Sequence, residues 1–202
     1  TGRAKYTTDV APPGTLYGAI VRSKFPAAHI RSVNLDKARS APGIRAALLA
    51  HPGEFDVRYH GQELAAIAGT SREAVLDAME LVTVDAEPRE FVVNEVDAMK
   101  ADAPSVFAGQ PNFGEGATKE TGAVDAAFAA AAAVVEATFE TPIQIHHPME
   151  PHAHTVRIDG DELTAWSSTQ AVFGCRGAFA ETMGMPQNKV RVVASYMTCA
   201  SQ

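Results

Sequence analysis

Residues 146–154 read HHPMEPHAH and hold four of the chain's seven histidines together with Glu150. Histidine nitrogens and carboxylate oxygens are ligands for zinc, which needs three or four donors that converge on one point. Pro148 and Pro151 do not fit a helix interior, so the segment is expected to be extended. The helical spacing that lets two histidines and a glutamate share one metal ion is therefore absent.

Side chains of an extended chain alternate between two faces. His152 and His154 then share one face. His146 and His147 point to opposite sides. At most two histidines and Glu150 converge without help from elsewhere, so the sequence predicts no metal site here. Two other roles stay open, namely hydrogen-bonded groups at the end of a strand and contacts between domains.

A second polar cluster, SSTQ at residues 167–170, follows a predicted strand and opens a predicted helix. Ser168 or Thr169 is a suitable N-cap for that helix. Gln170 offers one acceptor and two amide donors beside the free N–H groups of a helix start, where anionic oxygens are favoured. The cluster can serve only as a cap, or it can bind an oxo-anion or an anionic cofactor through Gln170.

Other catalytic patterns are absent or weak. The chain has no glycine-rich phosphate loop. Ser167, Ser168 and Ser195 lack the strand–turn–helix setting of a hydrolase nucleophile. Cys175 and Cys199 are expected to be packing residues rather than nucleophiles. Two cysteines make neither a disulfide framework nor an iron–sulfur ligand set, and a reducing, cytoplasmic location fits them.

The overall composition limits the partners that can be expected. The 202 residues suffice for one large domain or two small ones, and 46% hydrophobic with 20% charged residues is typical of globular proteins. A net charge of -7 without any basic block argues against nucleic acid and anionic membrane surfaces. The longest apolar run, residues 126–135, is far shorter than the ~20 residues of a membrane span.

Local patterns predict an α+β fold that mixes strands with helices. A capping box, TSRE at residues 70–73, begins one helix, and an Asp159-Gly160 turn between alternating apolar residues predicts a hairpin at 154–168. Residues 94–122 are polar and rich in proline and glycine, which indicates a long connection. Further helices are predicted at residues 37–41, 124–132 and 171–183, and strands at 15–22, 29–36, 44–50, 63–69, 81–88, 134–145 and 189–197.

Together these segments resemble the molybdenum-binding large subunit of the xanthine dehydrogenase/aldehyde oxidase family. PGTLYGAIVRS, AAHIRSVNLDKARSAPGIRAAL and VRYHGQELAAIAGTSREAVLDAMELVTVD follow the order and spacing of its α/β-hammerhead domain. VEATFETPIQIHHPMEPHAHTVRIDGDELTAWSSTQAVFG, with the residues after it, is similar to the start of its molybdenum-binding region. The resemblance implies a hammerhead domain at residues 1–100, a connecting segment at 101–122 and the start of a molybdopterin-binding domain at 123–202.

The resemblance also implies an activity, that of a molybdopterin-dependent dehydrogenase or hydroxylase. In the family, pterin-bound molybdenum hydroxylates a heteroaromatic or aldehyde carbon with oxygen from water, and electrons leave through two 2Fe-2S clusters to FAD. The glutamine of the STQ motif hydrogen-bonds an oxygen ligand of molybdenum, and this cofactor-binding role passes to Gln170. No metal-ligand role passes to the HxPMEP element.

One departure from the family pattern concerns the end of the chain. The family continues with a Gly-Gly-Gly-Phe-Gly loop where this chain has Thr198, Cys199, Ala200, Ser201 and Gln202. Glycines permit close backbone approach to a ligand, which this tail does not offer. The resemblance therefore implies an incomplete polypeptide, inactive alone, with its glutamate base and most pterin-binding segments beyond it.

The expected partners are the remainder of the large subunit, an iron–sulfur subunit, an FAD subunit and a small-molecule substrate. The alternative is a non-catalytic subunit-interaction module with the hammerhead fold. A hydrolase that uses a histidine-bound metal is the least favoured of the three hypotheses, because the HHPMEPHAH segment lacks convergent ligands.

Overall fold

The structure, a computed structural model, describes residues 2–114, 116–145, 147 and 149–196. The chain divides into two compact units: unit 1 comprises residues 1–15 and 135–202, and unit 2 comprises residues 16–134. Each unit has its own strands, helices and hydrophobic core. Helices combined with three sheets confirm the predicted α+β fold class. The domain boundaries at residues 100 and 122 stay a prediction.

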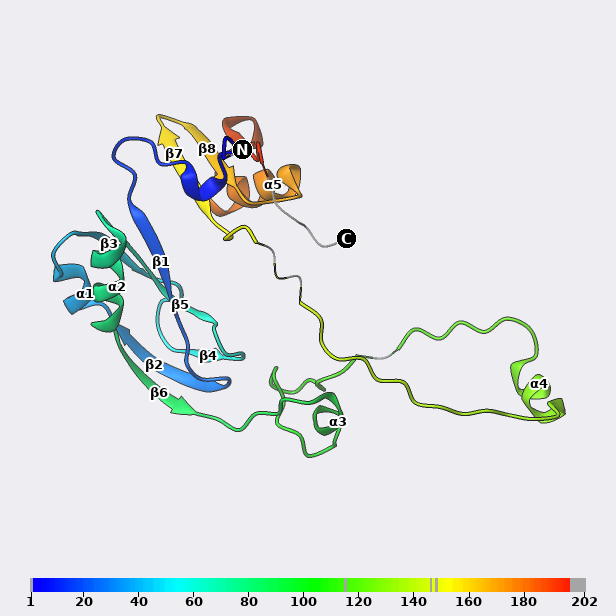
Figure 1. Cartoon of the computed structure of the whole chain (residues 1–202). Coiled ribbons are helices and arrows are strands. Elements are labelled where there is room, and N and C mark those ends of the chain that lie inside the picture. The colour runs from blue at the N-terminus through cyan, green and yellow to red at the C-terminus, as the bar shows by residue number, and fades with distance from the viewer. Residues whose placement is uncertain (1, 115, 146, 148, 197–202) are drawn as a thin grey trace. The chain divides into compact units, whose positions relative to one another are not determined.

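Unit 2 holds two three-stranded antiparallel sheets with four helices. Its elements are, in chain order, β1 (Tyr17–Arg22), β2 (Ala28–Asn34), α1 (Asp36–Ser40), β3 (Ile44–Leu49), β4 (Phe55–Val57), β5 (Glu63–Gly69), α2 (Arg72–Glu80), β6 (Thr83–Pro88), α3 (Glu95–Ala98) and α4 (Val124–Ala130). β5 lies between β1 and β3, and β2 lies between β4 and β6 (Figure 1). The short elements β4 and α3 are not predicted by the sequence pattern.

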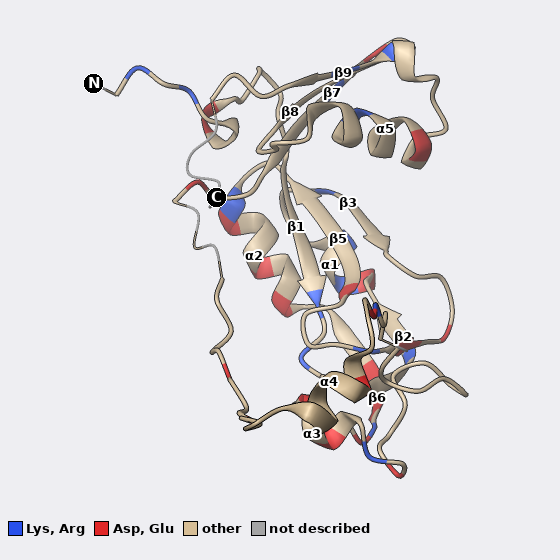
Figure 2. Ribbon diagram, turned by 90° about the vertical axis from the view of Figure 1, so that its right-hand side faces the viewer, with Lys and Arg blue, Asp and Glu red and all other residues tan. Residues whose placement is uncertain are grey.

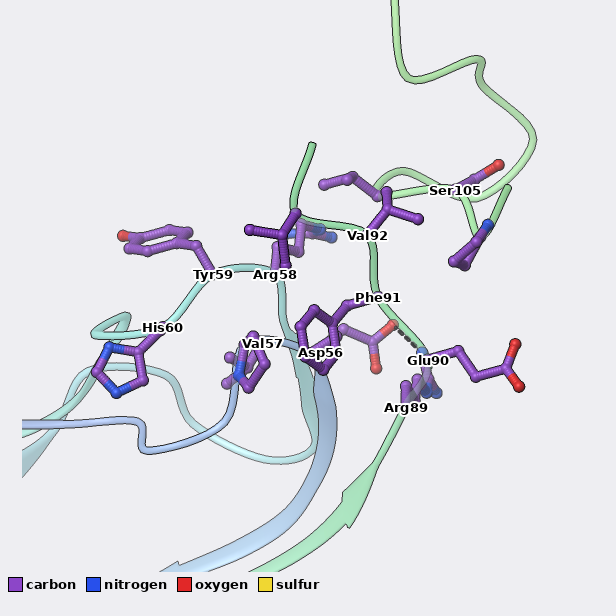
Figure 3. A pocket seen from close by; sticks show the side chains of 15 residues that line it. Asp56, Val57, Arg58, Tyr59, His60, Arg89, Glu90, Phe91, Val92 and Ser105 are labelled. Atoms are coloured by element: carbon purple, nitrogen blue, oxygen red, sulfur yellow. Dashed lines mark ion pairs between the residues drawn. The ribbon is translucent and has the colours of Figure 1, made fainter. Parts of the chain in front are cut away.

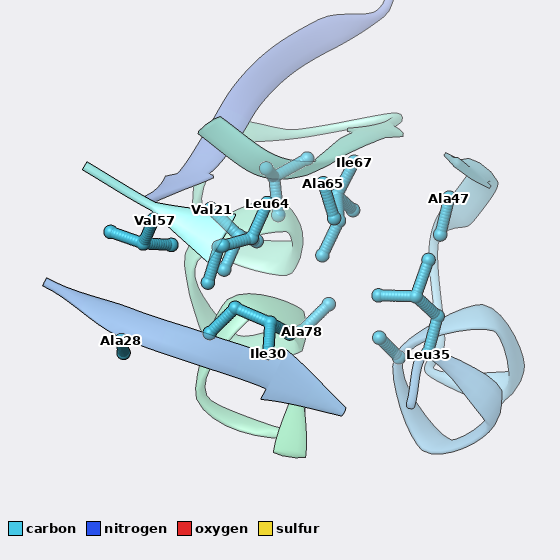
Figure 4. Packing of buried hydrophobic residues seen from close by; sticks show 12 residues of the cluster. Val21, Ala28, Ile30, Leu35, Ala47, Val57, Leu64, Ala65, Ile67 and Ala78 are labelled. Atoms are coloured by element: carbon cyan, nitrogen blue, oxygen red, sulfur yellow. The ribbon is translucent and has the colours of Figure 1, made fainter. Parts of the chain in front are cut away.

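The core of unit 2 draws side chains from both sheets and from α1 and α2. β5 contributes most because its sequence, ELAAIAG, is small or apolar at nearly every position. Leu64, Ala65 and Ile67 of this strand are buried with Ile30 of β2 and Ala78 of α2 (Figure 4). Such small side chains let strands and helices approach closely at the density of protein interiors.

One face of α2 packs against β1 and β5. Val75 and Ala78, three residues apart, are buried on that face. Glu73, Asp77 and Glu80 are exposed, and Figure 2 shows these acidic positions as red bands along the helix. The helix is therefore amphipathic, as its predicted pattern of apolar residues requires.

The start of α2 differs from the predicted capping box by one residue. The N-cap is Ser71, whose Oγ accepts a hydrogen bond from the N–H of Ala74 at 3.1 Å. The backbone N–H of Thr70 instead donates to the carbonyl of Gly43 at 2.8 Å. Since this bond holds Thr70 to the turn before β3, the helix begins one residue later than predicted, and the prediction of Thr70 as the cap is wrong.

A pair of alanine substitutions tests this cap. Ser71→Ala is expected to lower the free energy of unfolding by about 1 kcal/mol, because one N–H of the first helical turn loses its acceptor. Thr70→Ala is the matched control and is expected to change it by less than about 0.5 kcal/mol, since only its backbone is used. Urea unfolding followed by circular dichroism measures both, and equal losses for the two variants would contradict the assignment.

Gly69, at the end of β5, is buried in a space that has no room for a side chain. A Cβ there would lie 3.0 Å from the Gly43 carbonyl oxygen, from Cδ1 of Ile44 and from Cγ2 of Val75. One of the three contacts is with backbone, which cannot rotate away as a side chain can. A glycine at this position is therefore required by packing rather than by backbone conformation.

Gly69→Ala is expected to destabilise the chain by about 1–3 kcal/mol, the usual range for overpacking a core. Gly18→Ala, on the neighbouring strand β1, is the control, because a Cβ at Gly18 has only one neighbour, at 4.0 Å. The same urea titration is the measurement. A loss for Gly18→Ala as large as that for Gly69→Ala would show that strand glycines, not close packing, cause the effect.

Unit 1 is built around a mixed sheet in the order β7-β8-β9. Its elements are η1 (Thr7–Asp9), β7 (His154–Asp159), β8 (Glu162–Ser167), α5 (Val172–Thr182), η2 (Gln187–Lys189) and β9 (Val190–Val193). The predicted hairpin is confirmed, with Asp159 opposite Glu162 and Gly160 at a φ of 59° in the turn. β8 and β9 are parallel, and α5 provides the crossover that parallel strands need.

The N-terminal residues contact the sheet of unit 1, although 145 positions separate Val10 from Thr155 in sequence. The hydroxyl of Thr155 on β7 donates to the carbonyl of Val10 at 3.0 Å. The rings of Tyr6 and Tyr196 lie 6.1 Å apart in a tilted arrangement. The polar lead before β1 is therefore part of unit 1.

None of the helices in the described ranges is long and apolar enough to cross a membrane.

The strand predicted at residues 134–145 is wrong, because all of these residues lie outside the nine strands of the described chain. The apolar side chains of Val135, Phe139 and Ile143 are each at least 91% exposed. A strand is stabilised by hydrogen bonds and side-chain pairs with a neighbouring strand, and no described segment pairs with this one.

Candidate functional site

The β7–β8 hairpin brings the two polar motifs of the sequence side by side. Its register pairs His154 with Ser167, so the residues just before β7 face those just after β8. One more backbone bond continues beyond the strands, from the N–H of Ser168 to the carbonyl of Ala153 at 3.2 Å. The end of HHPMEPHAH and the start of the SSTQ turn (residues 167–170) are therefore neighbours.

Glu150 connects the two motifs through its side chain. It is 6% exposed and is the only charged residue in the buried class among the described residues. One carboxylate oxygen, Oε1, accepts a hydrogen bond from the hydroxyl of Ser168 at 3.0 Å. The same hydroxyl lies 3.4 Å from the carbonyl of Pro151. Because an unsatisfied buried carboxylate is costly, this bond ties the position of Ser168 to that of Glu150.

Thr169 stabilises the next part of the SSTQ turn with its side chain. Its Oγ1 accepts a hydrogen bond from the N–H of Ala171 at 3.1 Å. The N-cap of α5 is Ala171, which has no side-chain cap bond. The prediction that Ser168 or Thr169 caps the helix is therefore wrong. Both hydroxyls act before the helix begins, because one binds Glu150 and the other shapes the turn.

Gln170 lies at the end of this turn, two residues before α5. Its side chain is exposed and makes no hydrogen bond within the described part of the chain. The first N–H groups of α5 are also without intrahelical acceptors, as at any helix start, and no side-chain cap takes their place. An amide with two free donors therefore lies beside several free backbone donors.

Ser167 and Cys175 lie behind the turn. Ser167 is fully buried, and the thiol of Cys175 lies 3.8 Å from its hydroxyl oxygen. Cys175 is half-buried on α5 and forms no disulfide. The pair packs β8 against the helix that follows the SSTQ turn.

The described histidines of the HHPMEPHAH segment do not converge. The His154 ring packs edge-on against Phe179 of α5, with centroids 5.6 Å apart and planes at 88°. His147 and His152 are exposed, and His147 has a left-handed φ of 43°. Within the described ranges no group of three His, Cys, Asp or Glu side chains is arranged to hold a metal ion. His146 and Pro148 lie outside the described residues.

A second group of titratable side chains lies in unit 2, around a hollow of about 330 Å³. Nδ1 of His29 lies 2.8 Å from Oδ1 of Asp56, and its Nε2 lies 3.2 Å from Glu54. Oδ2 of Asp56 pairs with Arg89 at 2.9 Å, the ion pair drawn in Figure 3. The opposite charges of His29, Asp56, Glu54 and Arg89 thus bind one another.

Sequence and structural comparisons identify what the chain is similar to. Residues 107–198 match the family model described as the molybdopterin cofactor-binding domain, and residues 1–52 match the aldehyde oxidase and xanthine dehydrogenase a/b hammerhead domain. The nicotinate dehydrogenase large molybdopterin subunit of Eubacterium barkeri is 32% identical over 95% of this chain and 49% of its own length.

Two solved structures agree with these matches. Carbon monoxide dehydrogenase from Oligotropha carboxidovorans is 28% identical, with a TM-score of 0.76 over 96% of this chain and 28% of that chain. An aldehyde oxidoreductase from Desulfovibrio desulfuricans shares the fold, with 22% identity and a TM-score of 0.84 over 96% of this chain and 25% of that one. The chain belongs to the xanthine dehydrogenase/aldehyde oxidase family of molybdenum-binding large subunits.

The family assignment comes with a difference in length. The chain spans about half or less of the relatives that it matches. The molybdopterin match includes the SSTQ turn and Glu150. The Thr198, Cys199, Ala200, Ser201 and Gln202 tail, which departs from the glycine loop of the family, lies outside the described residues.

The groups around Gln170 suit an anionic, pterin-bound oxo-metal group. Neutral N–H donors at a helix start favour the oxygen atoms of an anionic group. The Gln170 amide and the free N–H groups of α5 are donors of this kind. The donors at Gln170 and the start of α5 thus fit such a group in their chemistry, and the cofactor-binding role of Gln170 stays a prediction.

Sequence reasoning singles out Gln170, Glu150 and Ser168 separately but does not bring them together. The signal is nevertheless present in the hairpin. A two-residue turn after Asp159 fixes the register, and the register places residue 153 opposite residue 168. The burial of Glu150 has no comparable signal, because a carboxylate between two prolines is normally expected at the surface.

The His29 cluster gives unit 2 a pH-dependent contribution to stability. Hydrogen bonds to Asp56 and then Glu54 hold the pKa of His29 above its ordinary value of 6.5. The hydrogen bond to His29, followed by that to Arg89, holds the pKa of Asp56 below its ordinary value of 3.8. The first contribution is lost as pH rises through the raised pKa of His29, and the second is lost as pH falls through the lowered pKa of Asp56. Both are present between about pH 4 and pH 6.5.

Raising the pH from about 5.5 to about 8.5 is therefore expected to lower the free energy of unfolding more in the wild type than in His29→Gln, which cannot become charged. Urea titrations at the two pH values measure the difference. His60→Gln is the control, since His60 lines the same hollow but has no acidic partner in the described chain. An equal pH dependence in wild type and His29→Gln would refute the assignment.

Proposed function

We propose that this chain is part of a molybdenum-cofactor-dependent oxidoreductase that hydroxylates a heteroaromatic or aldehyde carbon with oxygen derived from water. The observation that carries the proposal is Gln170, a free amide on an anchored turn within the molybdopterin cofactor-binding match. Large subunits related to this chain are named as nicotinate and carbon monoxide dehydrogenases. Nicotinate is a heteroaromatic acid, which favours a substrate of that class.

The cofactor, when bound, supplies the oxygen transfer and accepts the two electrons of the reaction. The chain's own contribution is to bind and orient that group. Nε2 of Gln170 would donate a hydrogen bond to an oxygen atom of the bound group, and the N–H groups of α5 would favour its negative charge. Donors that are fixed before the reaction need no reorganisation as charge develops, which is the main source of electrostatic catalysis.

Turnover also needs protein outside these residues. We propose as partners the remainder of the large subunit with its glutamate base, and iron–sulfur and FAD subunits that carry electrons away. The exposed apolar side chains of Val135, Phe139 and Ile143 support a partner surface, since such side chains are normally covered. By itself the chain is expected to be inactive. Two cysteines without a disulfide framework favour the cytoplasm as its location.

The same exposed segment favours the alternative, a non-catalytic module that docks on other subunits. Metal and pterin analysis separates the two hypotheses. Molybdenum and pterin that co-purify with the chain only when the rest of the large subunit is present support the proposed enzyme. A chain that assembles with partner subunits but never with molybdenum supports the module.

Replacing Gln170 tests the proposed site directly. In the completed enzyme, Gln170→Ala is expected to lower kcat by about 10²-fold, the order seen when one donor to a developing charge is removed. The fold should survive, because this side chain is exposed and makes no hydrogen bond within the described chain. Gln187→Ala is the control, since Gln187 lies outside the SSTQ turn, on η2, and its side chain accepts a hydrogen bond from Arg176 at 3.4 Å. Steady-state kinetics measure kcat for both variants. A wild-type kcat in Gln170→Ala would rule the assignment out.

A further inference from the structure

We propose that Glu150 is a positioning residue that fixes Gln170 toward the molybdenum cofactor by holding Ser168. The inference rests on the proposed function of Gln170. It assigns to the PMEP glutamate a task in the site, through its hydrogen bond with Ser168. Glu150 acts through the Ser168 hydroxyl, so it is not itself a catalytic residue.

The first argument is burial. A carboxylate that is 6% exposed keeps its charge only where hydrogen bonds replace water. The Ser168 hydroxyl is such a donor, at 3.0 Å. A hydroxyl has one hydrogen, and the carboxylate is both the closer and the stronger acceptor than the Pro151 carbonyl at 3.4 Å. The side chain of Ser168 is therefore held in one rotamer by Glu150.

The second argument is the way in which Ser168 is tied to the backbone. Its N–H is already bonded to the carbonyl of Ala153, so main chain and side chain are both anchored to the segment that carries Glu150. Two residues later comes Gln170, which has no bond of its own in the described chain. The bond from Ala171 N–H to Thr169 Oγ1 closes the turn around it. The orientation of Gln170 thus depends on the anchor at Ser168.

The third argument is the precision that a cofactor contact needs. A displacement of about 1 Å at a reacting group can lower a rate by two orders of magnitude, although no contact to the substrate is removed. Pro151 follows Glu150 directly and fixes one backbone angle of the chain that presents the carboxylate. The exposed amide is therefore supported by a buried bond and a stiffened backbone, as a precise site requires.

The test compares four variants in the completed enzyme, namely the full-length large subunit with its partner subunits. Glu150→Ala and Ser168→Ala remove the two sides of the bond, and the double variant removes both. Glu150→Gln keeps an oxygen that accepts from the Ser168 hydroxyl. Glu181→Ala, an exposed carboxylate near the end of α5, is the matched control. Molybdenum and pterin content, kcat, KM and the EPR signal of the partly reduced molybdenum centre are measured for each.

The expected results follow from an action through Ser168. Glu150→Ala and Ser168→Ala each lower kcat about tenfold while KM changes by less than about twofold, as for a lost interaction made only in the transition state. The double variant is no worse than either single variant, because both remove one bond. Glu150→Gln recovers kcat to within about threefold of wild type. The EPR signal shifts in Glu150→Ala toward that of Gln170→Ala, while molybdenum content stays at the wild-type level.

Other results overturn the proposal. Additive losses in the double variant, or Glu150→Gln as slow as Glu150→Ala, show that Glu150 does not act through Ser168. An unshifted EPR signal with lowered kcat shows a general structural effect. If Glu150→Ala does not fold, the kcat values of Glu150→Gln and Ser168→Ala still test the proposal. A wild-type kcat in Gln170→Ala would refute the function proposed for Gln170. If kcat is lowered in Gln170→Ala but is wild-type in Glu150→Ala, only the positioning role of Glu150 is refuted.

Discussion

The hydrogen bond from the Ser168 hydroxyl to the buried Glu150 carboxylate is the interaction on which the candidate site depends. The sheet of unit 1 ends just before it, and the helix α5 begins just after it. The turn between the two has no apolar side chain that packs into the core. Polar bonds alone therefore define its shape, and the bond to Glu150 is the one that reaches furthest along the chain.

Much of the fold is readable from local sequence signals. In unit 2, the small apolar run of β5, the Pro42-Gly43 turn and the amphipathic pattern of α2 each predict the element that forms. The β7–β8 hairpin and α5 follow from equally local patterns in unit 1. These predictions succeed because each depends on residues that are close in sequence: an alternation, a turn or a helical face.

The errors come from interactions that are not local. The cap of α2 lies at Ser71 because Thr70 is bonded to Gly43, far back in the chain. Residues 134–145 are predicted as a strand, but a strand also needs a neighbour, and the described residues offer none. Gln170 was within reach of sequence reasoning because its motif is short. The burial of Glu150 was not, because it results from the whole packing of unit 1.

A neutral amide on a fixed turn suits a cofactor that changes its charge during turnover. A lysine or arginine beside the metal would bind its more negative state strongly and slow the return to the other state. An amide donor and the partial positive charge of a helix start stabilise added charge more weakly, and neither titrates near neutral pH. The negative charge of Glu150 in turn accepts a hydrogen bond from Ser168, while the Gln170 amide donates none in the described chain. The buried charge of Glu150 thus makes the turn rigid, while the exposed donor, the Gln170 amide, carries no charge.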